Sequence, residues 1–154
     1  MSRIRLRNLV EEDRSSVYDL LGNDQVMKFI GPRKSLSKNE SDDWFSSELK
    51  NPSRYVVASI ESNDLLGFCG VKNIEGTLDF GYFLREKYWG QGYAKEACSL
   101  ALKELSKRLD LSIVEIFIAC DNEASLGVAK SLGWSFLGAT NKNGERGELY
   151  GVHM

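Results

Sequence analysis

The chain has 154 residues, of which 42% are hydrophobic and 27% charged, a size and composition typical of one soluble globular domain. Its formal charge of −2 excludes a strong overall basic field, so we expect no nucleic acid partner and no membrane partner bound through bulk charge. The only histidine is His153, which argues against a Ser-His-Asp hydrolase and against histidine-rich metal catalysis.

Cysteine usage and the apolar runs favour a cytoplasmic protein. Cys69, Cys98 and Cys120 are widely spaced within apolar runs and form no CxxC pair, so buried reduced thiols are expected rather than disulfides or a zinc site. The N-terminal segment lacks the apolar stretch of a signal peptide, and no apolar run approaches the ~20 residues of a membrane helix. We therefore expect no metal and no membrane contact.

In the first half of the chain, hydrophobic periodicity predicts one strand followed by two helices. Residues 3–9 alternate apolar side chains with arginines, as a half-buried strand does. The acidic stretch 11–13 suits the N-terminus of a helix that ends before Gly22. Ser37 and Glu40 have the spacing of a capping box at the start of the second helix.

The second half predicts strands around one long helix. Three strands in succession suggest an antiparallel meander, and the strand–helix–strand order after it predicts a right-handed crossover with parallel strands. The complete order, βααβββαβαββ, indicates a single mixed α/β domain over 1–154, with a mostly antiparallel sheet, one parallel pair and about four helices. The predicted elements are strands at 55–61, 65–74, 78–84 and 112–120, helices at 93–109 and 123–132, and a final hairpin around Asn143-Gly144.

The stretch KYWGQGYAKEA, residues 87–97, joins the strand 78–84 to the long helix. Gly90 and Gly92 can adopt φ > 0 and let backbone N–H groups at the helix start approach a ligand, while Lys87 adds a positive charge. Such a helix N-terminus favours phosphate. On spacing alone, the two glycines could equally serve only to turn the chain. Neither GxGxxG nor GxxxxGK[ST] is present.

The same stretch resembles motif A of the GNAT-superfamily N-acetyltransferases, [RQ]-x-x-G-x-[GA], with Lys87 in the place of Arg or Gln. The opening segment RIRLRNLVEEDRSSVYDLLGNDQVMKFIG and the core LDFGYFLREKYWGQGYAKEA look like the ribosomal-protein N-terminal acetyltransferase-like branch. The stretch DNEASLGVAKSLGWSFLG is similar to the NxxSxxxxxxxGF pattern that follows. The resemblance covers most of the 154 residues in the family's order.

The resemblance implies that acetyl-CoA lies in a gap between the strands 78–84 and 112–120. Backbone groups of Phe83 and Leu84 would pair with the pantetheine arm, and Asn122 would hydrogen-bond the arm from the other side. Asn122 could instead cap the helix that follows it, or do both. Lys87 would add charge, and the pyrophosphate would be held by the backbone N–H groups of Trp89, Gly90, Gln91, Gly92, Tyr93 and Ala94.

The resemblance also implies that an acetyl group is transferred to a primary amine by direct attack through a tetrahedral intermediate. The N–H of Leu84 would donate to the oxyanion. Asp79 takes the position of the branch's glutamate base and would act through a bridging water, or it is only a solvated carboxylate at a strand start. Ser125 matches the family's serine near the thiol, or is an ordinary first-turn helix residue. The chain departs from the family at Gly127, where the branch often has Arg, and at Ala129, where many members have Tyr.

The acceptor is predicted only as a class of amine. Deprotonation at pH 7 costs about 1 kcal/mol for an α-amine and about 5 kcal/mol for a lysine, which favours a protein N-terminus or a small-molecule amine. Trp44, Phe45 and the GPRKS loop could wall the acceptor cleft, although Trp44 could instead pack in the core. A non-catalytic acyl-CoA-binding or regulatory domain is the alternative, and a ligand-free partner-binding domain is a third possibility. Monomer and homodimer both stay open.

Overall fold

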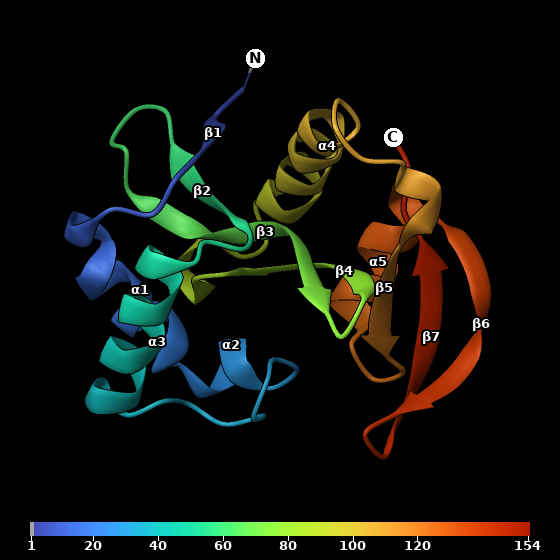
Figure 1. Ribbon diagram of the computed structural model, residues 1–154, viewed down its shortest axis with the longest axis horizontal. Helices are drawn as coiled ribbons and strands as arrows, with labels where there is room; N and C mark the ends of the chain where they lie inside the picture. Colours follow the sequence, from blue (N-terminus) through green and yellow to red (C-terminus); the bar gives the residue numbers. More distant parts are fainter. Residues whose placement is uncertain (1) are drawn as a thin grey trace.

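The computed structural model describes residues 2–154 and contains one seven-stranded sheet with helices on both of its faces (Figure 1). The strand order is β1-β2-β3-β4-β5-β7-β6, and among the described residues only β4 and β5 pair in parallel. The strands are β1 (Ile4–Arg7), β2 (Tyr55–Ser59), β3 (Leu65–Ile74), β4 (Thr77–Leu84), β5 (Val114–Ala119), β6 (Ser135–Lys142) and β7 (Glu145–Gly151). The helices are α1 (Arg14–Leu21), α2 (Asp24–Met27), α3 (Lys38–Lys50), α4 (Tyr93–Leu105) and α5 (Glu123–Ser131).

The mixed α/β architecture predicted from the sequence, with its mostly antiparallel sheet and one parallel pair, is confirmed. Residues 2–154 form five helices, where about four were expected. The additional one is the single turn α2, which forms because the Asn23 side chain accepts hydrogen bonds from the N–H groups of Gln25 and Val26. The predicted capping box of α3 is present, since Ser37 and Glu40 exchange hydrogen bonds at its N-terminus.

Several predicted boundaries shift by two or more residues; the strand expected over 55–61, for example, ends at Ser59. The helix expected over 93–109 ends at Leu105, because the N–H groups of Lys107 and Arg108 bond three residues back, to Glu104 and Leu105, instead of four. The strand expected from residue 112 begins at Val114, because the Asp110 carboxylate accepts a hydrogen bond from the N–H of Ser112 and starts a 3-10 turn.

The parallel strands β4 and β5 pair over only a short length. Leu78 lies opposite Val114 and Asp79 opposite Glu115, and no further β4–β5 pair follows within residues 2–154. Beyond these pairs the strands diverge, while β5 continues along β7 on its other side (Figure 1). The edge of β4 that faces β5 therefore has unpaired backbone groups over its second half.

Each face of the sheet has its own apolar core. Helices α4 and α5 cover the face that contains Phe80, and helices α1 and α3 cover the face that contains Phe68. Phe83 packs against the second core, while Arg54 lies against Gly81 on that same face and pairs with Asp79. This alternation of β4 side chains agrees with the sequence-based expectation.

Cys69 and Cys98 are buried in the core between β3 and α4, as expected. Cys120 is exposed, so its predicted burial is wrong; it follows the last residue of β5 and lies outside both cores. Within residues 2–154, no helix has both the length and the apolar character to cross a membrane. The same residues contain no group of three or more His, Cys, Asp or Glu side chains that could hold a metal ion.

Candidate functional site

Two cavities meet where β4 and β5 diverge. The first, which we call the loop cavity, has a volume of about 510 Å³ and follows the segment 88–95 at the start of α4. The second, the strand cavity, has a volume of about 360 Å³ and lies over β3 and β4. Both volumes fall within the range of small-molecule binding sites. The residues that line both cavities are Phe29, Ile30, Tyr82, Phe83, Asn122 and Ser125.

The loop cavity is bordered by backbone N–H groups at the start of α4. Gly90 has φ 71° and Gly92 has φ 81°, a region that disfavours residues with a Cβ, so both glycines are required by the turn. Gly92 is the N-cap of α4 and offers no side chain to its N–H groups. From Gly90 to Lys95, no N–H donates a hydrogen bond to any described residue. These free donors and the helix dipole favour an anion here.

Side chains around this turn fix its shape. Trp89 Nε1 donates to the carbonyl of Leu84 at 2.9 Å, and the N–H of Trp89 donates to Glu86 at 3.0 Å. Trp89 therefore contributes its ring to the cavity wall, and its N–H is already bonded. Gln91 Nε2 donates to the carbonyl of Lys87 at 3.0 Å. Neither Gln91 nor Lys87 is among the residues that line the loop cavity.

A charged network anchors the segment between β4 and the turn. Arg85 is 8% exposed and pairs with Asp19 at 2.9 Å and with Asp64 at 3.0 Å. Asp64 also accepts a hydrogen bond from Tyr88 and lies 3.7 Å from Lys87 Nζ. Burial raises the pKa of the Asp64 carboxyl, but the Tyr88 hydrogen bond and the Arg85 charge outweigh burial and leave that pKa lowered. No sequence pattern pointed to this network, since its members lie on separate elements.

Backbone direction along β4 determines which groups face the gap. The N–H of Arg85 donates to Leu66 of β3 at 2.7 Å, so alternation directs the backbone of Phe83 toward β3 as well. The backbone groups of Tyr82 and Leu84 then point toward the gap, and the Trp89 hydrogen bond to the Leu84 carbonyl agrees with this direction. The backbone of Phe83 thus faces β3 and not the gap, where the sequence analysis expected it, and Phe83 contributes its ring to both cavities instead.

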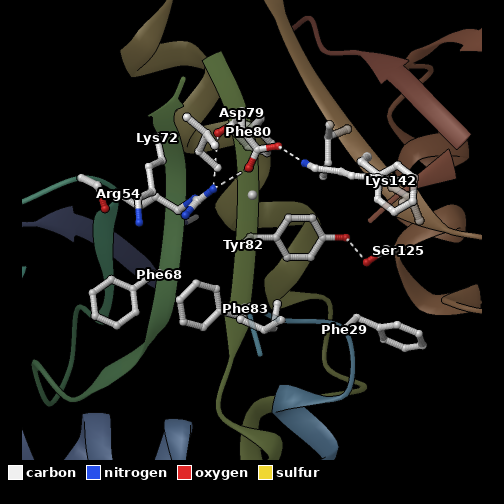
Figure 2. A pocket seen from close by; sticks show the side chains of 18 of the residues that line it. Phe29, Arg54, Phe68, Lys72, Asp79, Phe80, Tyr82, Phe83, Ser125 and Lys142 are labelled. Atoms are coloured by element: carbon white, nitrogen blue, oxygen red, sulfur yellow. Dashed lines mark hydrogen bonds and ion pairs between the residues drawn. The ribbon is translucent and has the colours of Figure 1, made fainter. Parts of the chain in front are cut away.

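Tyr82 and Ser125 form a hydrogen bond at the junction of the two cavities. The Tyr82 hydroxyl donates to Ser125 Oγ at 3.0 Å, which joins β4 to the first turn of α5 (Figure 2). Burial raises the pKa of the Tyr82 phenol, so it stays protonated at neutral pH. Asn122 Oδ1 accepts from the N–H of Ser125 at 3.3 Å, which confirms its capping role, and Asn122 Nδ2 donates to no described residue. Tyr82 was not among the residues predicted for the site, although strand alternation places it on the α5 face.

Asp79 lies in the strand cavity among cations. Its carboxylate accepts a hydrogen bond from Arg54 Nη2 at 2.8 Å and lies 3.8 Å from Lys142 Nζ, and the two cations approach it from opposite sides (Figure 2). Lys72 lies directly across from Asp79 in the β3–β4 pairing. The Asp79 side chain is 18% exposed, so it is not the freely solvated carboxylate that the sequence left open.

Aromatic rings form the other wall of the strand cavity. Trp44 of α3 packs edge-on against Phe68 with ring centroids 5.3 Å apart, and Phe68 packs against Phe83 at 5.4 Å. Trp44 therefore packs on the core and lines the cavity at once, which combines the two roles left open from the sequence. Gly31 and Arg33 of the GPRKS loop line the cavity too, while Phe45 is buried in the core.

The comparisons with known proteins agree with this geometry. Residues 3–135 match the family described as "Acetyltransferase (GNAT) domain", so the chain belongs to the GNAT acetyltransferase family. Among solved structures, a GNAT-family acetyltransferase from Bacillus anthracis superposes with a TM-score of 0.82 at 23% identity, covering 97% of this chain and 92% of that chain.

Two further relatives have named acceptors or ligands. RimL, a ribosomal L7/L12 alpha-N-protein acetyltransferase solved in complex with coenzyme A, superposes with a TM-score of 0.76 at 19% identity, covering 97% of this chain and 93% of that one. The spermidine N(1)-acetyltransferase of Escherichia coli strain K12 is 25% identical over 138 residues, which are 88% of this chain and 74% of the relative. The structural similarity supports the GNAT fold.

Proposed function

We propose that the protein is an N-acetyltransferase that moves an acetyl group from acetyl-CoA to a primary amine. The observation that carries this proposal is the meeting of two cavities at the Tyr82–Ser125 hydrogen bond. One cavity presents anion-binding backbone groups and the other presents side chains, so donor and acceptor can reach one point from opposite sides. We also propose that residues 1–154 act as one acetyltransferase domain.

The residues of the loop cavity fit coenzyme A. The free N–H groups from Gly90 to Ala94 would hold the pyrophosphate, and the glycines leave no Cβ that would keep it away. The gap-facing backbone groups of Tyr82 would bond the pantetheine arm as a neighbouring strand would, since the Leu84 carbonyl already accepts from Trp89. Asn122 would donate its free Nδ2 to the arm while its Oδ1 caps α5. Bound there, acetyl-CoA supplies an activated thioester.

The residues at the junction provide for charge and proton movement during transfer. The N–H of Leu84 would donate to the carbonyl oxygen as negative charge develops on it. The amine nitrogen forms a bond to the carbonyl carbon and releases a proton, while the bond from that carbon to sulfur breaks. Ser125 Oγ would give its proton to the departing sulfur and take the hydroxyl proton of Tyr82 in its place. Tyr82 would then take the proton that the amine nitrogen releases. The proton count then balances and no side chain ends ionised.

Asp79 has a different role in this proposal from a general base. The Asp79 carboxylate already pairs with Arg54 at 2.8 Å and with Lys142 at 3.8 Å, so these cations occupy the positions from which an amine would approach its oxygens. An α-amine needs only about 1 kcal/mol to become neutral at pH 7, so such an acceptor can arrive deprotonated from solution. We propose that Asp79 organises the cations of the acceptor cavity, with a bridging water as its only path to the amine.

We also propose that the protein belongs to the RimL-like branch of the family. RimL is one of several proteins of similar fold, so the fold alone does not distinguish this branch from the others. The alternative, a non-catalytic acyl-CoA-binding or regulatory domain, would keep the loop cavity without a need for an acceptor cavity. The strand cavity, which is lined by aromatic and charged side chains, favours the enzyme. It meets the loop cavity at Tyr82 and Ser125, which we call the proton-carrying pair.

Release of free thiol from acetyl-CoA tests the function. Purified protein mixed with acetyl-CoA and a set of primary amines should release thiol only when an amine is present, and the acetylated amine should be detected in equal amount. Thermal unfolding with coenzyme A is the companion measurement, because a ligand at 100 times its Kd adds about 2.7 kcal/mol to the free energy of unfolding. Stabilisation without thiol release from any amine would establish the binding-domain alternative instead.

A further inference from the structure

We propose that the acceptor is a small amine that also bears a carboxylate, held by the cations around Asp79 in the strand cavity. This inference rests on the proposed function and specifies its acceptor. A relative that acetylates spermidine would suggest a polyamine as the acceptor instead. A polyamine would bring a second ammonium group close to the cations that line the strand cavity.

The charge around Asp79 is unbalanced. Arg54, Lys142 and Lys72 surround one carboxylate, which leaves this cluster with an excess of positive charge. Lys72 forms no ion pair within residues 2–154. Among the other charges of the cavity, Arg33 is paired with Glu145, and the Glu48 carboxylate offsets one positive charge, so an excess of one positive charge remains.

Arg54 is the best-placed donor in this cluster. Its Nε donates to the carbonyl of Gly70 at 3.2 Å and its Nη2 to Asp79, while Nη1 donates to no described residue. The Arg54 side chain is 15% exposed and lines the strand cavity. Burial lowers the pKa of this guanidinium, and the Asp79 charge offsets that effect only in part. A second carboxylate at Nη1 would replace lost solvation with a charge-assisted hydrogen bond.

Strand geometry sets the length of the acceptor. Asp79 and Tyr82 are three residues apart on β4, so their Cα atoms are about 10 Å apart, and both residues line the strand cavity although their side chains leave opposite faces of the strand. Subtracting one hydrogen-bond length of about 3 Å from this Cα separation gives an acceptor with roughly 7 Å between its amine and its carboxylate. An extended dipeptide spans about this distance, since two residues extend at most ~7 Å. Its α-amine also has the low pKa that the proposed function favours.

One opposing feature is Glu48, which also lines the strand cavity. Its carboxylate accepts hydrogen bonds from Ser53, at 3.1 Å and 3.2 Å from the hydroxyl. A diamine could place its second ammonium there instead. A measured preference for an acceptor with a carboxylate would point to the cations around Asp79 as the selecting groups, and a preference for an acceptor with a second ammonium would point to Glu48.

A matched pair of acceptors gives the test. Glycylglycine and glycylglycinamide have α-amines of similar pKa and differ in the terminal carboxylate, and spermidine provides the polycationic comparison. We expect kcat/KM to be about tenfold or more higher for the acid than for the amide, the size of one charge-assisted hydrogen bond. In a separate thermal-shift measurement with coenzyme A present, the acid should stabilise the protein more than the amide does.

Lys72→Glu should remove the preference for the acid or reverse it, and Lys72→Met should reduce it without adding a new charge. Lys107→Glu is the control, because Lys107 lies on the exposed surface beyond α4 and pairs only with Glu104 among the described residues. This control should keep the wild-type ratio of acid to amide.

Equal rates for the acid and the amide, or a faster rate with spermidine, would overturn the acceptor assignment while the acetyltransferase stands. An acid preference that Lys72→Glu leaves unchanged would overturn the role of the cluster. Absence of thiol release with every amine would instead defeat the proposed function. In that case, a thermal shift that favours the acid and disappears in Lys72→Glu would still support the carboxylate site.

Discussion

The two cavities are built from different parts of the polypeptide. In the loop cavity the groups that favour an anion are backbone N–H groups of one continuous segment, with two glycines at positive φ, while residues of α2, β4 and α5 complete the walls. The charged cluster of the strand cavity comes from side chains on separate elements: Arg54 precedes β2, Lys72 is on β3, Asp79 on β4 and Lys142 on β6. The comparison shows that single substitutions can change the charges of the strand cavity, whereas the backbone donors of the loop cavity depend on the conformation of the turn.

The largest expected effect concerns the junction that both cavities share. Ser125→Ala and Tyr82→Phe should each lower kcat by about 100-fold, the usual size of a lost proton donor, with little change in the Kd for coenzyme A. Both residues belong to one proton path, so the double variant should be hardly slower than either single one. Steady-state rates and calorimetric affinities measure this. Fully additive losses in the double variant would contradict a shared path.

The next effect tests the backbone character of the loop cavity. Gly90→Ala places a Cβ at φ 71°, which costs about 1–2 kcal/mol, and should raise the Kd for coenzyme A about tenfold. Gly133→Ala is a matched control, because Gly133 has φ 68° and a Cβ added there, like one added at Gly90, would meet no neighbouring atom within 4 Å. Both variants should lose similar stability in chemical denaturation, and only Gly90→Ala should lose affinity. Equal affinity losses would remove the special role of the turn.

A smaller effect concerns the network beside the loop cavity. The pKa of Asp64 is lowered in the folded protein, so its contribution to stability is present above the ordinary carboxyl value of 3.8 and is lost as pH falls below that value. Asp64→Asn should lower the free energy of unfolding by about 1 kcal/mol at pH 7, since the group is partly exposed. The difference from wild type should shrink between about pH 4 and pH 2. A constant difference over that range would show that Asp64 acts without its charge.

The smallest effect concerns α5, which borders both cavities. Gly127 lies inside this helix, and a Cβ added to it would meet no neighbouring atom within 4 Å, so Gly127→Ala should stabilise the protein by roughly 0.5–1 kcal/mol. Gly127→Arg tests whether a cation at this position improves binding of coenzyme A. Thermal unfolding and calorimetric titration measure the two results. An unchanged Kd in Gly127→Arg would show that bound coenzyme A does not interact with a positive charge at position 127.

Local rules predicted most of the fold and part of the site. The capping box at Ser37, the Asn122 cap and the glycine turn at Gly90 depend on neighbours a few residues away, and the structure contains all three. The two-residue turn at Glu75-Gly76 also fixes Lys72 opposite Asp79, so this pair could have been found from the sequence by counting back from the turn.

By itself, then, the sequence determined the features that depend on short-range hydrogen bonding and turn geometry. These are the helices and strands, their order, and the glycine turn with free N–H groups at the start of α4. Only the tertiary structure decided that Arg54 and Lys142 converge on Asp79 and that Tyr82 meets Ser125. Those pairs are 25, 63 and 43 positions apart, and their meeting depends on how β4 and β5 diverge and how β6 and β7 fold back. Contacts of that kind follow from the packing of the whole sheet, which no local pattern encodes.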